Sequence, residues 1–235
     1  LERHCFNNAK YIIANSNMIK EEIIDTYNIN PSKIYVIYNG IEFKEFDYEK
    51  SFKKLSNEFL INKNQPILLF VGSGFKRKGA EEFLEIISKI NNTAFKAFII
   101  GKEKNIKHYQ NLSKKLNIDD QVVFTGPRKD VDDFYTIGDI FIFPTHYDPF
   151  SNVVLEAMNF ENVVFTTRRN GASEILDEDF IMEKPYDTKV ISMINNLLIN
   201  KIALDKEKIK NKNLSKLFSI KKNLNKTLKV ISKIE

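Results

Sequence analysis

The sequence contains a single cysteine, Cys5, among 235 residues. One thiol excludes an internal disulfide framework and a cysteine-based zinc site, and it indicates a reducing, cytoplasmic setting. Long apolar runs are lacking too, since none approaches the roughly 18 residues of a membrane-spanning helix. No repeat of solenoid period is present. The pattern is that of a globular protein, and because it begins at Leu1 without an initiator Met, we expect it to be part of a longer one.

Two nucleotide-binding fingerprints are also missing. The glycine-rich segment Gly72–Gly79 lacks the Gly-x4-Gly-Lys-Ser/Thr spacing of a Walker loop. It does not have the Gly-x-Gly-x-x-Gly spacing of a dinucleotide site either. A dinucleotide-dependent oxidoreductase, one alternative for this chain, is therefore disfavoured.

A net positive charge is confined to the C-terminal tail. The net charge is +5, but residues 201–235 hold eleven Lys and three acids, a local +8, so the first 200 residues sum to −3. We therefore expect no nucleic-acid-binding surface on the globular body. Apolar residues recur at helical spacing in the tail, which predicts one or two amphipathic helices. Two roles stay open for them: packing on a neighbouring domain, or binding an anionic membrane surface, which would place the protein on the inner face of the plasma membrane.

Short apolar runs alternate with amphipathic stretches along the rest of the chain. Expected strands span 10–14, 34–38, 66–71, 95–100, 121–125, 140–144, 163–167 and 180–182. Expected helices span 48–62, 78–91, 105–117, 130–137, 151–160 and 187–200, with another running to Tyr27 after Ser16 as its N-cap. Runs such as ILLFV and IFIF are typical of a parallel sheet covered on both faces. The predicted fold class is α/β, a doubly wound, Rossmann-like parallel sheet, in which ligands bind at the carboxyl ends of the strands.

The loop that follows the strand PILLFV combines small residues with three cations, Lys76, Arg77 and Lys78. Small residues let the backbone approach a ligand, and a helix start offers unpaired N–H groups. This combination predicts a diphosphate site. The alternative is a basic surface turn with a glycine-assisted cap.

The loop that follows IFIFPT carries two carboxylates, Asp148 and Glu156, eight positions apart, with a helix start at Ser151 between them. The amides of Ser151, Asn152 and Val153 would form an anion-binding helix start. Glu156 lies among apolar neighbours, so it needs a partner, and a ribose diol would provide two hydrogen-bond donors. The alternative is an Asp in an N-terminal turn and a partly exposed Glu.

Two further loops follow strands. Arg128, in Gly126–Val131, could stack on a base or meet a phosphate, or else be a solvated turn cation. Gly171, in Asn170–Glu174, allows close approach, or else serves only the turn. All four loops follow parallel strands and so meet at one sheet edge, which favours a nucleotide-diphosphate ligand.

Six segments carry a family resemblance: ANS (14–16), YNGIE (38–42), VGSGFKRKG (71–79), FTGPRKDV (124–131), FPTHYDPFSNVVLEAM (143–158) and NGASEIL (170–176). In this order the chain resembles family 4 glycosyltransferases of the GT-B fold, especially the lipopolysaccharide core glucosyltransferase I branch, over roughly residues 10–200. The resemblance implies three parts: residues 1–43 from the N-terminal acceptor domain, 44–200 as the C-terminal nucleotide-sugar-binding domain, and 201–235 as helices that cross back to the acceptor domain or meet the membrane.

The resemblance also implies roles for individual residues. Lys78 and Arg77 would neutralise the donor diphosphate, Asp148 would bind hydroxyls of the donor sugar, and these three form the expected catalytic set. Glu156 would hold the ribose. The implied substrate-binding set is completed by Gly72, Ser73, Arg128, Phe150, Ser151, Asn152 and Val153. Asp148 stands where the family usually has Glu, and Ser73 where many members have Arg.

The activity implied is transfer of a hexosyl group, with retention, from a nucleotide-diphosphate sugar, with a UDP-sugar as the expected donor. The acceptor would be a saccharide or a lipid-linked saccharide, in assembly of cell-surface polysaccharide or lipopolysaccharide. The resemblance implies neither a metal nor another cofactor. A non-catalytic sugar-nucleotide-binding module and a GT-B sugar-nucleotide epimerase remain as alternatives.

Overall fold

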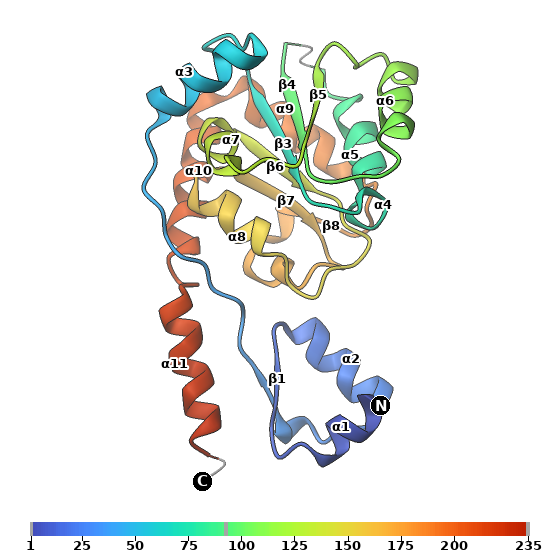
Figure 1. Cartoon of the computed structure of the whole chain (residues 1–235), viewed down its shortest axis with the longest axis vertical. Coiled ribbons are helices and arrows are strands. Elements are labelled where there is room, and N and C mark those ends of the chain that lie inside the picture. The colour runs from blue at the N-terminus through green and yellow to red at the C-terminus, as the bar shows by residue number, and fades with distance from the viewer. Residues whose placement is uncertain (1, 92–93, 234–235) are drawn as a thin grey trace.

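A six-stranded sheet forms the centre of the computed structural model, which describes residues 2–91 and 94–233 (Figure 1). The strand order is β5-β4-β3-β6-β7-β8, and every neighbouring pair is parallel. The strands are β3 (Ile67–Val71), β4 (Lys96–Ile100), β5 (Val122–Gly126), β6 (Ile140–Phe143), β7 (Val163–Thr167) and β8 (Ile181–Met182). Every residue of β3, β6 and β7 is buried. The predicted fold class is confirmed.

The order of the strands reverses at β3, and this reversal places the loops of interest. From β3 the chain runs outward to β4 and β5, then returns to β6 on the other side of β3. Right-handed crossovers put the connecting helices of the two halves on opposite faces of the sheet. The helices are α4 (Phe75–Lys78), α5 (Ala80–Ile87) and α6 (Ile106–Lys115) in the first half, and α7 (Val131–Ile137), α8 (Asn152–Asn159), η2 (Gly171–Ile175) and η3 (Glu178–Phe180) in the second. A crevice for a ligand is expected between the carboxyl ends of β3 and β6, where the order reverses.

The N-terminal segment forms a small unit of its own, at the lower right of Figure 1. It comprises α1 (Glu2–Asn8), β1 (Ile12–Ala14), α2 (Asn17–Tyr27), η1 (Pro31–Lys33) and β2 (Ile34–Val36), with β1 parallel to β2. Ser16 is the N-cap of α2, as predicted, and its side chain accepts a hydrogen bond from the Ile19 amide. Helix α1 was not expected from its sequence, ERHCFNN. In the structure none of its residues is buried.

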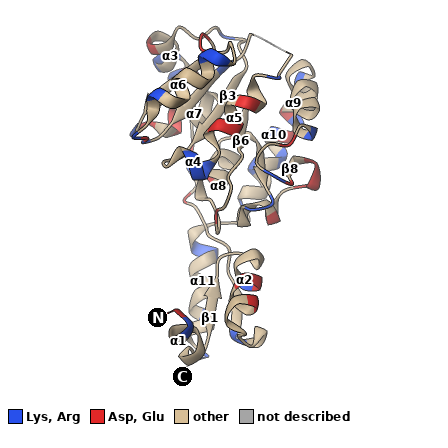
Figure 2. Cartoon of the chain, turned by 90° about the vertical axis from the view of Figure 1, so that its right-hand side faces the viewer, with Lys and Arg blue, Asp and Glu red and all other residues tan. Residues whose placement is uncertain are grey.

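The basic tail folds into two helices, as predicted, which follow α9 (Lys189–Ile199). Helix α10 (Lys201–Ser215) packs on α8 and α9, while α11 (Ile220–Ile231) lies beside the N-terminal segment (Figures 1 and 2). Ser219 forms a β-bridge with Ile41 in the linker that leads to α3 (Tyr48–Phe59). Leu224, Leu228 and Ile231 of α11 remain about half exposed. Among residues 2–91 and 94–233, none of the helices combines the length and the apolar character needed to cross a bilayer.

The single helix predicted over 78–91 is wrong, because α4 and α5 are separated at Gly79. This glycine has a φ of 82°, in the left-handed region. A Cβ at this position would lie 1.9 Å from the carbonyl oxygen of Pro144. The loops after β3 and β6 therefore touch backbone to backbone. The other predicted elements differ from the observed ones only at their ends.

Candidate functional site

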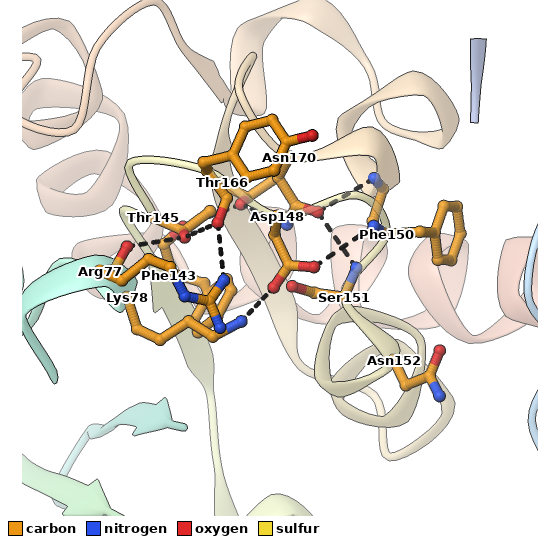
Figure 3. A network of polar contacts seen from close by, with 12 residues as sticks. Arg77, Lys78, Phe143, Thr145, Asp148, Phe150, Ser151, Asn152, Thr166 and Asn170 are labelled. Atoms are coloured by element: carbon orange, nitrogen blue, oxygen red, sulfur yellow. Dashed lines mark hydrogen bonds and ion pairs between the residues drawn. The ribbon is translucent and has the colours of Figure 1, made fainter. Parts of the chain in front are cut away.

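Lys78 and Asp148 meet beyond the carboxyl ends of β3 and β6. Lys78 ends α4, which follows β3, and Asp148 lies in the loop after β6; their side chains point toward one another and form an ion pair (Figure 3). The Lys78 ammonium also lies 5.2 Å from the centre of the Phe143 ring. The two side chains are only 14% and 10% exposed. The structure thus brings together the predicted diphosphate-binding cation and the predicted sugar-binding acid.

The Asp148 loop is held against the segment that follows β7. The amide of Asp148 donates to the Arg169 carbonyl at 2.9 Å, and the amide of Gly171 donates to the Asp148 carbonyl at 2.9 Å. One carboxylate oxygen of Asp148 also accepts from the Phe150 amide at 3.3 Å. The loop after β6 and the turn η2 therefore form one hydrogen-bonded unit.

The start of α8 is more occupied than the sequence predicted. The Ser151 amide donates to Oδ1 of Asn170 at 3.2 Å, so it is not free for an anion. The hydroxyl of Ser151, however, is buried and has no hydrogen-bond partner among the described residues. Asn152 is exposed, and its side chain accepts from Nδ2 of Asn39 at 2.9 Å. Val153 is partly buried against the core. The buried, unpaired Ser151 hydroxyl would gain a partner if a ligand bound here.

The glycine-rich loop does not offer the free helix start that was expected. The Phe75 amide, at the start of α4, donates to a carboxylate oxygen of Glu103 at 3.0 Å. Hydrogen bonds from the amides of Asn105 and Phe75 lower the pKa of Glu103. The hydroxyl of Ser73 accepts from the Lys102 amide at 3.1 Å. The Phe75 amide is therefore not free to bind a phosphate.

Arg77 and Gly72 support the Lys78–Asp148 pair from nearby. The Arg77 guanidinium donates to the Tyr147 carbonyl at 2.9 Å, one residue before Asp148, and the side chain is otherwise exposed. A Cβ on Gly72 would lie 3.3 Å from the Phe143 ring and 3.5 Å from the Lys78 stem. Gly72 thus leaves room for the lysine to pass over the ring.

Glu156 lines a pocket of about 300 Å³ together with Asn152 of the same helix. Its carboxylate accepts from the Tyr135 hydroxyl at 3.2 Å, and burial raises the pKa of both side chains. Lys44 also lines this pocket and forms an ion pair of 2.6 Å with Asp132. The remaining lining residues are Gly40, Ile41, Glu42, Val131, Asn152, Asn159, Phe160 and Ile220. Neither Lys78 nor Asp148 is among the residues that line this pocket.

Two predicted residues have other partners. Arg128 forms ion pairs of 2.8 Å with Asp130 and 2.7 Å with Glu58, and lies 5.3 Å from the centre of the Phe134 ring. Hydrogen bonds to these acids raise the pKa of Arg128. The Phe150 side chain is buried, with its ring centre 5.6 Å from that of Tyr38. The Arg128 guanidinium is thus committed to acids of α3 and the α7 start, and the Phe150 ring to packing.

Sequence reasoning missed Lys44 and Tyr135. Lys44 lies in an irregular linker with no periodic pattern, and Tyr135 reads as a core residue of its helix. In the sequence, the one signal for this pocket was Glu156, an acid among apolar neighbours that needs a partner. In the part of the chain that the structure describes, no group of three or more His, Cys, Asp or Glu side chains could hold a metal ion.

Two family models match most of the chain. Residues 51–216 match the family model described as Glycosyl transferases group 1, and residues 1–45 match Glycosyltransferase Family 4. The capsular polysaccharide biosynthesis glycosyltransferase CapM of Staphylococcus aureus is 33% identical over 212 residues, which cover 83% of this chain and 54% of CapM. An uncharacterised glycosyltransferase of Methanocaldococcus jannaschii is 29% identical over 174 residues, 72% of this chain and 45% of that protein. The chain spans about half the length of the curated relatives it matches.

Solved structures share the fold. The glycosyltransferase WaaG, described as involved in lipopolysaccharide biosynthesis, superposes with a TM-score of 0.77 at 19% identity, covering 91% of this chain and 62% of WaaG. HepE of Anabaena, in complex with UDP and glucose, superposes with a TM-score of 0.85 at 18% identity, covering 97% of this chain and 65% of HepE.

Proposed function

This chain belongs to the glycosyl transferases group 1 family. We propose that it binds a nucleotide-diphosphate sugar between the carboxyl ends of β3 and β6, with UDP-glucose as the first candidate. The observation that carries the proposal is the meeting of Lys78 and Asp148 at this place. The nearly buried Lys78 ammonium could exchange Asp148 for the diphosphate of such a donor. The nearly buried Asp148 carboxylate could exchange Lys78 for hydroxyls of the sugar. The UDP and glucose bound by HepE, a protein of the same fold, support the choice of ligand.

The proposed binding mode exchanges the ion pair for contacts with the donor. The diphosphate would take Lys78 and, at the rim, Arg77, while hydroxyls of the sugar would donate to Asp148. The unpaired hydroxyl of Ser151 lies at the start of α8, where backbone N–H groups and the helix dipole favour negative charge. A sugar phosphate would therefore gain a hydrogen bond as well as charge neutralisation here.

The proposed reaction breaks the bond between the anomeric carbon and the diphosphate and forms a bond from that carbon to a hydroxyl oxygen of the acceptor, whose proton passes to the departing phosphate. Negative charge then grows on the departing nucleoside diphosphate, and Lys78 and Arg77 would stabilise it electrostatically. Asp148 would orient the sugar. We propose turnover without a metal, since these cations would supply the positive charge at the leaving group. Retention of configuration is proposed from the family resemblance alone.

The pocket lined by Glu156 would receive the nucleoside. Glu156 would accept hydrogen bonds from the ribose diol, and its partial burial against Tyr135 favours a partner of this kind. The acceptor, a saccharide or a lipid-linked saccharide, would bind mainly outside this chain. We propose that residues 1–43 are part of an acceptor domain, that 44–200 form the donor domain and that the half-exposed face of α11 packs on the former in a cytoplasmic protein.

Titration calorimetry on the 235-residue chain tests the proposal. UDP, UDP-glucose and GDP-mannose are titrated into the wild type, into Lys78→Ala and into Lys76→Ala, a matched control. Lys76 is an exposed lysine on the same short helix. Lys78→Ala should weaken binding by about tenfold or more, because charge-assisted hydrogen bonds to the diphosphate are lost. Equal affinities of the two variants, or no binding by the wild type, would remove the donor site from this place.

A further inference from the structure

Glu174, in the turn η2, gathers four hydrogen-bond donors from the N-terminal part of the chain. Its Oε1 accepts from the Met18 amide at 2.7 Å. Its Oε2 accepts from the Asn17 amide at 2.9 Å, from Nδ2 of Asn17 at 2.8 Å and from the Tyr38 hydroxyl at 2.8 Å. The two amides open α2, where the helix dipole favours a negative charge. Glu174 is an exposed residue, so it is these donors and not burial that hold its carboxylate in place.

The start of α2 also touches the loop that carries Asp148. Ser16, the fully buried N-cap of α2, donates its hydroxyl to the Pro149 carbonyl at 2.8 Å. A Cβ on Gly171 would lie 2.0 Å from that same carbonyl oxygen and 2.5 Å from Cβ of Ser16. The backbones of α2, η2 and the Asp148 loop are therefore in direct contact, with no room for a side chain between them.

These contacts form a closed triangle. One side joins η2 to the loop, through the Gly171 amide on the Asp148 carbonyl. The second joins the loop to α2, through Ser16 and Pro149. The third joins α2 to η2, and Glu174 provides it. Without the third side, α2 can withdraw, and the Pro149 carbonyl then loses its hydrogen bond next to Asp148.

We propose that Glu174 is a positioning residue for the sugar end of the donor site. It fixes α2 against η2 and thereby holds the Asp148 loop in the conformation that a donor sugar needs. The inference deepens the proposed function and rests on it. Glu156 is not part of the triangle, so we expect the effect of Glu174 to be larger on the sugar than on the nucleoside.

The proposal predicts a difference between two ligands of the same 235-residue chain. In Glu174→Gln, the side chain keeps its size but loses its charge and one of its two accepting oxygens. The Kd for UDP-glucose should rise about tenfold, because charge-assisted hydrogen bonds that position the loop are lost, while the Kd for UDP should change by less than about twofold. Hydrogen exchange of the Asn17 and Met18 amides should become faster, and UDP-glucose should slow it in the wild type only.

Glu178→Gln is the matched control, since it makes the same chemical change on an exposed acid of the neighbouring turn η3, where Glu178 pairs with Arg168. It should leave both Kd values and both amides unchanged. Wild-type affinity of Glu174→Gln for UDP-glucose would overturn the inference and leave the proposed function intact. An equal loss for UDP and UDP-glucose would also overturn it, because it would indicate general loosening. A wild-type chain that binds neither ligand refutes the proposed function itself, and the inference with it.

Discussion

Breaking the Lys78–Asp148 pair should destabilise the ligand-free protein and change its ligand preference in opposite directions for the two partners. Both side chains are nearly buried, at 14% and 10% exposure, so removing one leaves the other charge without a partner. Two unit charges about 4 Å apart attract by about 4 kcal/mol at an effective dielectric constant of about 20. Desolvation offsets part of this attraction. We therefore expect Lys78→Met and Asp148→Asn each to lower the free energy of unfolding by about 3 kcal/mol.

The double variant isolates the interaction between the two side chains. It contains neither charge, so its loss of stability should be smaller than the sum of the single losses, with a coupling energy of about 2 kcal/mol. Urea unfolding followed by circular dichroism measures all four free energies. Single losses that add to within about 0.5 kcal/mol would refute the pair as an energetic unit.

Calorimetry on the same four proteins connects this energy to binding. A diphosphate must displace Asp148 from Lys78, so Asp148→Asn should bind UDP about tenfold more tightly if about 1.4 kcal/mol of the coupling of about 2 kcal/mol is lost when UDP binds the wild type. The same variant should lose the additional affinity that the sugar gives UDP-glucose. Lys78→Met should weaken both ligands. Weaker UDP binding by Asp148→Asn would show that the acid does not compete with phosphate.

Two further predictions concern the backbone and pH. Gly79→Ala should lower the free energy of unfolding by about 3 kcal/mol, because φ is left-handed and the new Cβ would lie only 1.9 Å from the Pro144 carbonyl oxygen. A variant that unfolds at the same temperature as the wild type would contradict this prediction. Burial raises the pKa of Glu156 above its ordinary value of 4.5, so the folded state binds the proton of this carboxyl more tightly than the unfolded state does. The stability that the protonated carboxyl contributes is therefore lost as pH rises through the raised pKa. Glu156→Gln should therefore be more stable than the wild type at pH 7.5, with an advantage that shrinks toward pH 4.5, whereas a difference independent of pH in thermal unfolding would refute this reading.

The order and type of most elements could be predicted from the sequence, because they depend on local patterns. Continuous apolar runs indicated strands buried on both faces, and the observed β7 has the predicted bounds, 163–167. Ser16 was identified as a cap because the hydroxyl serves amides only three residues away. Parallel topology then placed Lys78 and Asp148 at one sheet edge, since loops that follow neighbouring parallel strands meet there.

The tertiary structure was needed to find which backbone and side-chain groups of these loops already have partners within the chain. The break at Gly79 depends on a carbonyl 65 positions away in the chain, at Pro144, and the Phe75 amide is taken by Glu103 rather than left for phosphate. Glu174 closes its contact with α2 across 157 positions. Such contacts depend on ångström-scale approach between distant segments, which periodicity and residue type do not encode. Local patterns in the sequence therefore predicted which loops carry the candidate site, and packing decided which of its side chains already have partners within the chain.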